Sequence, residues 1–237
     1  MESLGRSIFS GIQKFTTIDD NGYVGMILFT GGCNFRCSYC HNPLFVLPEK
    51  IKFMEKKEIL SLLEKRRNLV DSVIICGGEP TMHPNLINWI DYIKSMGFRI
   101  KLDTNATNSK MFKKIIGNKK VDFVAIDYKA PKEKYSNIIQ VNFNVDIIIE
   151  NLKYLVSSGV DYEIRTTIHP DLHSKEDIFE MINQLKNIKI KNYYLQVFKM
   201  PIETVGIVKD KNFDNNFFDD IKLELEKNFE KTGIRNL

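Results

Sequence analysis

The chain has 237 residues, of which 43% are hydrophobic and 27% are charged, so it can bury one sizeable core and we expect residues 1–237 to form a single domain. Its formal net charge of +4 is carried by lysines spread along the whole sequence, which favours solvated helix faces over a nucleic-acid site. The longest apolar runs, such as residues 24–29, are too short to cross a bilayer, and residues 1–15 contain no continuous apolar stretch. We therefore expect a protein of the reducing cytoplasm that does not enter the membrane.

Short apolar, β-branched runs alternate with longer helical patterns, which predicts βα units, a parallel sheet and the α/β fold class. In chain order, the strands are predicted at Val24–Phe29, Ser72–Cys76, Arg99–Asp103, Phe123–Asp127, Asp161–Thr167 and Asn192–Phe198. The helices are predicted at Lys56–Arg67, Asn85–Ser95, Ser109–Ile116, Asp146–Ser157, Lys175–Lys186 and Phe213–Lys231.

Polar residues end or follow each predicted strand. They are the cysteine loop at 31–43, Gly77-Gly78-Glu79-Pro80, Asp103-Thr104-Asn105, Asp127-Tyr128-Lys129, Arg165-Thr166-Thr167 and Gln196. In a parallel α/β fold the carboxyl ends of the strands share one edge, where loops build active sites. A polar residue that merely ends a strand would explain each of these alone. Together they predict a functional site at that edge.

Cys33, Cys37 and Cys40 are spaced C-x3-C-x2-C, and the remaining cysteine, Cys76, lies far away in an apolar run. A structural zinc site needs four ligands, and His41 or Cys76 is the alternative for the fourth. Cys76 in its strand is more typical of a small packed hydrophobe. A [4Fe–4S] cluster normally takes four thiolates, so three thiolates leave one iron open to a ligand from outside the protein.

The cysteine spacing with Tyr39 before the last cysteine, followed by "GGEP" at 77–80, resembles the radical S-adenosylmethionine (SAM) superfamily. The resemblance implies a partial (β/α)6 TIM-like barrel with a [4Fe–4S] cluster held by Cys33, Cys37 and Cys40. It also implies that the amino and carboxyl groups of SAM bind the open iron, and that reduction cleaves SAM to methionine and a 5′-deoxyadenosyl radical.

The resemblance and the residue types together give roles to the other polar residues of this edge. Candidates for binding the cofactor are Tyr39, Gly77, Gly78, Glu79, Asp103, Thr104, Asn105, Asp127 and Gln196. Glycines allow close backbone approach, and Glu79 can accept hydrogen bonds from an ammonium group. Lys129 and Arg165, with Asp127, are the candidates for steering the substrate. The simpler alternatives are an ordinary turn at 77–80, a packed Tyr39 and a structural ion pair between Asp127 and Lys129.

Within the superfamily, the chain is similar to the glycyl-radical-enzyme activases, most closely to those of anaerobic ribonucleoside-triphosphate reductase. The stretches that carry this resemblance are "CHNP" at 40–43, "KLDTNATN" at 101–108, "DYKAP" at 127–131 and "YEIRTTIHP" at 162–170. Ala106 departs from the pattern, since glycine is usual after the asparagine. The resemblance implies an anaerobic enzyme that forms a glycyl radical on a partner protein and takes electrons from a flavodoxin- or ferredoxin-type donor.

Two other functions fit the same cysteine loop. One is a radical SAM enzyme that acts on a small molecule such as a deazapurine precursor, although Lys129, Arg165 and Gln196 do not by themselves make a substrate pocket. The other is an iron–sulfur electron carrier or redox sensor, which would not bind SAM.

Overall fold

The computed structural model describes residues 4–201, 203–214 and 216–237. The chain divides into two compact units: the residues up to Asn34 with Asn42–Val124, and Phe35–His41 with Ala125–Leu237. Cys33 therefore belongs to the first unit, and Cys37 and Cys40 belong to the second. The expectation of a single domain over residues 1–237 stays a prediction.

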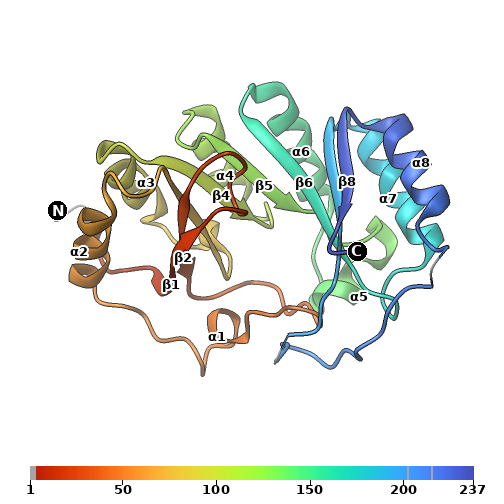
Figure 1. Ribbon diagram of the computed structural model, residues 1–237, viewed down its shortest axis with the longest axis horizontal. Helices are drawn as coiled ribbons and strands as arrows, with labels where there is room; N and C mark the ends of the chain where they lie inside the picture. The colour runs from red at the N-terminus through yellow and green to blue at the C-terminus, as the bar shows by residue number, and fades with distance from the viewer. Residues whose placement is uncertain (1–3, 202, 215) are drawn as a thin grey trace. The chain divides into compact units, whose positions relative to one another are not determined.

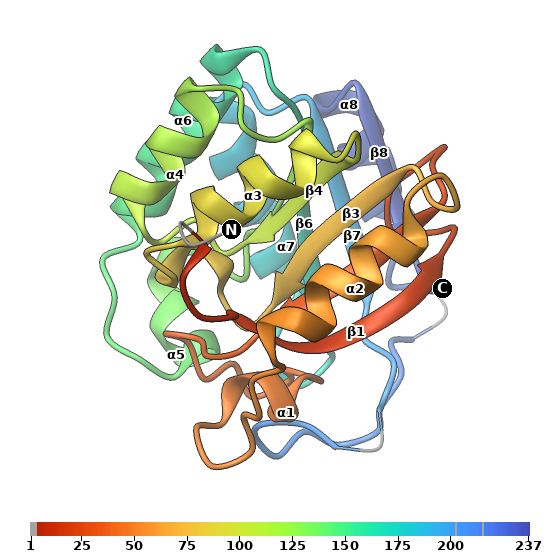
Figure 2. The same ribbon diagram turned by 90° about the vertical axis from the view of Figure 1, so that its left-hand side faces the viewer.

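The first unit is built on a sheet in which one antiparallel strand precedes parallel ones. Its strands are β1 (Phe9–Thr16), β2 (Gly25–Thr30), β3 (Ser72–Gly77) and β4 (Arg99–Thr104). Strand β1 pairs antiparallel with β2, whereas β2 with β3 and β3 with β4 are parallel pairs. Its helices are α1 (Pro43–Val46), α2 (Lys56–Arg66), α3 (Leu86–Ser95) and α4 (Ser109–Gly117), with a 3-10 turn η2 (Pro80–Met82). Figure 2 shows α2 and α3 in front of β3 and β4.

Strands β2 and β3 are buried on both faces. Met26 and Leu28 are buried on one face of β2, and Ile27 is buried on the other. Residues that alternate along a strand point to opposite faces, so a continuously apolar strand must be covered on both sides. The register pairs Thr30 with Gly77, which brings the ends of β2 and β3 together and places the start of the cysteine loop beside Gly78.

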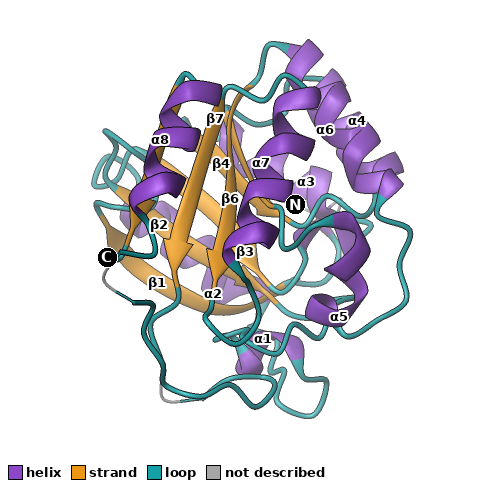
Figure 3. Cartoon of the chain, turned by 90° about the vertical axis from the view of Figure 1, so that its right-hand side faces the viewer, coloured by secondary structure: helices purple, strands orange, loops and turns teal. Residues whose placement is uncertain are grey.

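The second unit carries the remaining parallel strands. These are β6 (Asp161–Ile168), β7 (Asn192–Val197) and β8 (Lys231–Arg235), while β5 (Phe123–Asp127) crosses the boundary between the units. Strands β6 and β7, and β7 and β8, are parallel pairs, and Figure 3 shows β6 and β7 ending at the same side. The helices are α5 (Tyr135–Ile139), α6 (Asp146–Ser158), α7 (Lys175–Asn187) and α8 (Asp219–Asn228), with a 3-10 turn η3 (Lys132–Lys134). Helix α8 packs on α7 and on β8 (Figure 1).

Local chemistry explains where the helices of this unit begin and end. Helix α7 starts at a capping box, in which Ser174 Oγ accepts from the Asp177 N–H at 3.2 Å and Asp177 Oδ2 accepts from the Ser174 N–H at 2.9 Å. Helix α6 ends at Gly159, whose φ of +73° is a left-handed conformation that glycine adopts without strain.

The predicted α/β class is confirmed, but the structure corrects two parts of the prediction. Strands β1 and β8 were missed, because both are partly exposed and carry charged residues and glycine. The final helix was predicted at Phe213–Lys231, yet only Asp219–Asn228 is helical, and residue 215 lies outside the described residues. Phe213, Phe217 and Phe218 pack on one another before the helix, with Phe213 and Phe217 4.3 Å apart between ring centroids.

Within the described part of the chain, no helix combines the length and the apolar character needed to cross a bilayer.

Candidate functional site

The loop after β3 is joined to the cysteine loop by backbone hydrogen bonds within the first unit. The Gly78 N–H donates to Thr30 O at 2.9 Å, and the Glu79 N–H donates to Gly32 O at 2.7 Å. A Cβ atom at Gly78 would lie 2.0 Å from Gly32 O, and one at Gly77, where φ is +111°, would lie 2.6 Å from Thr30 N. Gly78 is therefore needed for the approach of the cysteine loop and Gly77 for that of the end of β2, and their predicted contact with SAM stays a prediction.

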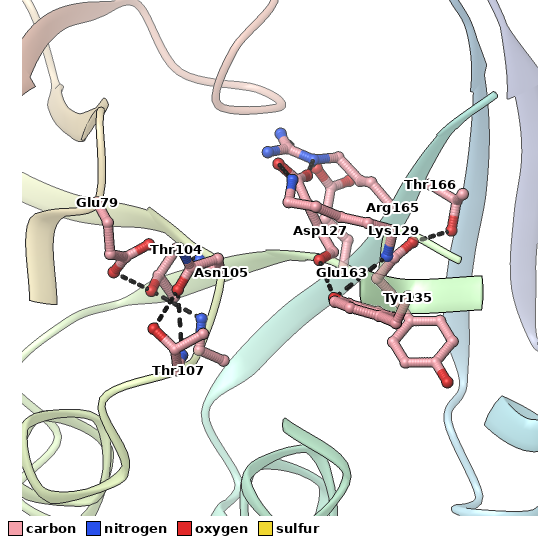
Figure 4. Close-up of polar contacts among 12 residues, drawn as sticks. Glu79, Thr104, Asn105, Thr107, Asp127, Lys129, Tyr135, Glu163, Arg165 and Thr166 are labelled. Carbon is pink, nitrogen blue, oxygen red and sulfur yellow. Dashed lines mark hydrogen bonds and ion pairs between the residues drawn. The ribbon is translucent and has the colours of Figure 1, made fainter. Parts of the chain in front are cut away.

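Glu79 is the centre of a polar network in the first unit (Figure 4). Its carboxylate is 1% exposed and accepts hydrogen bonds from the Thr81 N–H at 3.0 Å, from Thr104 Oγ1 at 2.6 Å and from the Asn105 N–H at 2.7 Å. Thr81 Oγ1 donates to the same carboxylate. Burial raises the pKa of Glu79, while these hydrogen bonds lower it, and the net shift is upward. Glu79 thus links the ends of β3 and β4, in addition to its predicted contact with the SAM ammonium group.

Asn105 extends this network back to the residue that follows Cys33. Its Nδ2 donates to Asn34 Oδ1 at 2.9 Å, Asn34 Nδ2 donates to Thr107 Oγ1 at 2.9 Å, and Thr107 Oγ1 donates to Asn105 Oδ1 at 2.7 Å. These bonds form a closed ring that fixes the amide groups of both asparagines. Ala106, between Asn105 and Thr107, is fully buried with a φ of +56°, a left-handed conformation that glycine adopts more easily than alanine.

Asp103 and Cys76 lie in the same unit but outside this ring. Asp103 Oδ1 is 3.8 Å from Lys101 Nζ, and its side chain is 19% exposed. Cys76 is half-buried in β3, where Thr30 Oγ1 donates to its carbonyl at 3.0 Å. The predictions that Asp103 binds the cofactor and that Cys76 does not bind the cluster stay predictions.

In the second unit, the predicted steering residues form one cluster of ion-paired side chains, which we call the charged cluster. Asp127 Oδ1 lies 3.1 Å from Arg165 Nε, and Asp127 Oδ2 lies 3.4 Å from Lys129 Nζ (Figure 4). Burial would raise the pKa of Asp127, but the cations of Arg165 and Lys129 outweigh it and lower that pKa to about 2. Asp127 is therefore ionised at neutral pH, and the group as a whole is positive.

Two further members of the charged cluster, Glu163 and Arg235, were not predicted from the sequence. Arg165 Nη1 is 3.6 Å from Glu163 Oε1, and Arg235 Nη2 is 2.7 Å from Glu163 Oε2. The Arg235 guanidinium carbon also lies 4.1 Å from the centroid of the Tyr194 ring. Glu163 lies two residues before Arg165 on β6, so strand periodicity could have found it, whereas Arg235 depends on the pairing of β8 with β7.

The charge of Lys129 also affects the ionisable side chains of the cysteine loop in this unit. Burial would lower the pKa of Lys129, but the neighbouring Tyr39, Asp127 and Cys37 raise it well above its usual value. Burial raises the pKa of the Cys37 thiol to about 11, and Lys129 opposes that shift. A cation beside a buried thiol favours its thiolate form, which is the form that binds a metal.

Tyr39 is buried between aromatic rings of the same unit. Its ring centroid is 6.4 Å from that of His173 and 6.5 Å from that of Phe198. His173 Nδ1 accepts from the His169 N–H at 3.2 Å, so its Nε2 carries the hydrogen that is donated to Lys129 O at 2.9 Å. The packing of Tyr39 is thus established, and its contact with adenine stays a prediction. Gln196 is half-buried near the end of β7, paired in register with Thr167 and Arg235.

The side chains of the cysteine loop are of the kinds that can bind an iron–sulfur cluster. Cys37 is buried, Cys40 is half-buried, and the Cys40 N–H donates to Cys37 O at 3.0 Å in a tight turn. Between them, the buried Ser38 hydroxyl has no hydrogen-bond partner among the described residues. A buried hydroxyl without a partner is costly, and a thiolate or sulfide sulfur would accept a hydrogen bond from it. In neither unit by itself do the described residues gather three His, Cys, Asp or Glu side chains around a metal position, so the three-cysteine ligand set stays a prediction.

Comparisons with known proteins identify the family. The profile described as "Radical SAM superfamily" matches residues 27–185, which is more than half of the chain. A Methanocaldococcus jannaschii protein named as a glycyl-radical enzyme activating enzyme is 32% identical over 230 residues, covering 89% of this chain and 95% of the relative. The pyruvate formate-lyase-activating enzyme of Clostridium pasteurianum is 29% identical, covering 91% of each chain. A GTP 3′,8-cyclase of Staphylococcus epidermidis is 27% identical, covering 72% of this chain and 52% of the relative.

A solved structure shows the same fold. The crystal structure of Streptococcus suis SuiB bound to S-adenosylmethionine superposes with a TM-score of 0.68 at 17% identity, over 86% of this chain. The chain spans about half the length of SuiB, with 48% of that protein covered. The cofactors of this family are a [4Fe–4S] cluster and SAM, as the cysteine motif implied. The chain therefore belongs to the radical SAM superfamily, and within it groups with the glycyl-radical enzyme activating enzymes.

Proposed function

We propose that this protein activates a glycyl-radical enzyme, most specifically an anaerobic ribonucleoside-triphosphate reductase. The observation that carries the proposal is the 32% identity with an activating enzyme over nearly the whole of both chains. The choice of the reductase rests on the stretches at 40–43, 101–108 and 127–131 that resemble its activases.

The proposal assigns cofactor-binding roles to residues of each unit. The thiolates of Cys33, Cys37 and Cys40 would hold the cluster, and Glu79, Thr104 and Asn105 would shape the first unit's part of the SAM site. When bound, the cluster would supply the electron for reductive cleavage of SAM, which yields a 5′-deoxyadenosyl radical able to remove a hydrogen atom.

The charged cluster of the second unit is the proposed steering group for the glycine loop of the partner enzyme. Lys129 and Arg165 are 12% and 14% exposed, and both are held in place by Asp127. Together with Glu163 and Arg235, the group holds three cations and two carboxylates, and its net positive charge can orient a carbonyl-rich backbone loop. Glycine suits such a target because it has no side chain, so its loop can enter a narrow opening.

The test is an anaerobic reaction of the reconstituted, reduced protein with SAM and each glycyl-radical enzyme encoded in the same genome. We expect 5′-deoxyadenosine by chromatography and a doublet radical by electron paramagnetic resonance on the reductase. The radical should disappear when the glycine of the partner is changed to alanine, and both products should disappear with Cys37→Ala. Flavodoxin- and ferredoxin-type proteins, the proposed electron donors of a cytoplasmic enzyme, can each replace the chemical reductant in the same assay.

A radical SAM enzyme that acts on a small molecule is the second candidate, and the identity with GTP 3′,8-cyclase favours it. It predicts SAM-dependent consumption of a purine compound with no radical on any partner protein. An electron carrier or redox sensor, in contrast, would hold a cluster and show no SAM binding in equilibrium titration.

A further inference from the structure

Part of the segment between β7 and α8 is hydrogen-bonded to the cysteine loop within the second unit. We call residues 204–211 the strap. The Val205 N–H donates to Cys40 O at 2.8 Å, and the Gly206 N–H donates to Ser38 O at 2.9 Å. These two bonds hold the backbone on both sides of Tyr39, in the part of the loop that carries Cys37 and Cys40.

Gly206 lies so close to the loop that a side chain cannot fit. A Cβ atom at this position would lie 2.7 Å from Ser38 Cα, 2.8 Å from Ser38 Cβ and 3.1 Å from Ser38 O. These are backbone and near-backbone atoms, so the contact cannot be relieved by turning a flexible side chain. Any larger residue must move the strap or the loop.

The far end of the strap is anchored to the loop after β6. His169 Nδ1 accepts from the Asp171 N–H at 3.1 Å, so its Nε2 carries the hydrogen and donates to Lys209 O at 2.9 Å. His169 is fully buried, and its ring centroid lies 5.3 Å from that of Phe198. An ion pair of 2.9 Å between Lys211 Nζ and Asp171 Oδ1 fastens the end of the strap. Side chains of the loop after β6 therefore fix a segment that has no regular structure of its own.

We propose that the strap positions Cys37 and Cys40 for cluster binding, with Gly206 and His169 as its positioning residues. The proposal rests on the role of these cysteines in the proposed function. Backbone bonds to Ser38 and Cys40 keep the loop in one conformation before the cluster arrives, which lowers the entropy lost when the thiolates bind it. The strap residue Ile207 is 98% exposed, so the strap is held by its backbone contacts and not by burial of this side chain.

The first test uses the apoprotein, so it does not depend on activity. Alkylation of Cys37 and Cys40 is followed by mass spectrometry in Gly206→Ala and in the matched control Gly233→Ala. A Cβ atom at Gly233 meets only Tyr194 ring atoms at 3.7 and 3.9 Å, an ordinary contact. We expect Cys37, which is 6% exposed, to react about tenfold faster in Gly206→Ala because the loop opens more often, and at the wild-type rate in the control. Equal rates in wild type and Gly206→Ala would overturn the proposal.

A second pair of variants covers the case in which Gly206→Ala does not fold. His169→Gln keeps an N–H that can reach Lys209 O, and His169→Leu does not. We expect faster Cys37 alkylation and faster loss of cluster absorbance to a chelator in His169→Leu, with rescue in His169→Gln. Similar behaviour of the two variants would contradict the role of this hydrogen bond. Failure of the proposed function would instead appear as absent 5′-deoxyadenosine formation in the wild type with normal alkylation differences.

Discussion

The replacement Glu79→Gln gives the sharpest test of the first unit's polar network. The side chain keeps its volume, but one acceptor oxygen becomes an NH2 donor. If the amide oxygen takes the position of Oε1, which accepts from Thr81 and Thr104, then the NH2 group faces the Asn105 N–H. Two donors then meet inside the protein without an acceptor. Reversing the amide only moves the conflict to the Thr81 N–H.

The size of the effect follows from the number of bonds lost. A buried donor left unsatisfied costs about 1–3 kcal/mol, and hydrogen bonds to a charged group contribute about 1.5–3 kcal/mol. Relief of the buried charge offsets part of this, since burial raises the pKa of Glu79. We therefore expect Glu79→Gln to lower the free energy of unfolding by about 2 kcal/mol.

The assay is anaerobic urea unfolding of the apoprotein, with Glu226→Gln as the control because Glu226 is exposed on α8. Hydrogen exchange of the peptide that contains Asn105 supplies a local measurement, and its amide should exchange faster in Glu79→Gln alone. A loss of less than about 0.5 kcal/mol, matching the control, would refute the reasoning. It would mean that the carboxylate does not accept these hydrogen bonds in solution.

Two further predictions follow from the site. Asp127→Asn should lower the free energy of unfolding at pH 7 by about 1 kcal/mol or less, since Asp127 is 36% exposed and solvent screens its ion pairs. Because folding lowers the pKa of Asp127 from 3.8 to about 2, its contribution is present above pH 4 and is lost as the pH falls toward 2. Unfolding curves of wild type and Asp127→Asn should thus converge on acidification, and a constant gap would contradict the ion pairing. Ala106→Gly should stabilise the protein by up to about 1 kcal/mol, as relief of the left-handed alanine exceeds the entropy cost of glycine. Thermal unfolding measures it against Ala130→Gly, a fully buried alanine without positive φ that should destabilise, and equal losses in both would refute the account.

Much of the candidate site was predictable because its residues are fixed by short local patterns. The alternation of apolar and helical runs places Glu79, Asn105 and Asp127 at or just beyond the ends of consecutive strands, and Arg165 in the second half of the next strand. Parallel pairing then brings the ends of neighbouring strands to one edge, as the match of Thr30 with Gly77 shows. The cysteine spacing is likewise local, so the family could be inferred before any fold was known.

Other features depended on contacts between residues far apart in the chain. No local pattern marks Lys231–Arg235 as a strand, because its short run of polar residues and glycine is extended only through pairing with β7. The ion pair between Arg235 and Glu163, which lies 72 residues earlier, therefore depends on formation of the sheet. The same holds for Gly206, whose need for glycine comes from Ser38 and not from its own backbone conformation.

The sequence by itself determined the α/β class, the superfamily and the residues at the strand ends, because periodicity and motif spacing act over a few neighbouring positions. Only the tertiary structure decided the partners of those residues. Glu79 accepts hydrogen bonds from Thr81, Thr104 and Asn105, and Lys129 is close to both Asp127 and the cysteine loop. Such partnerships depend on which side chains are buried together, and burial is a property of the folded chain as a whole.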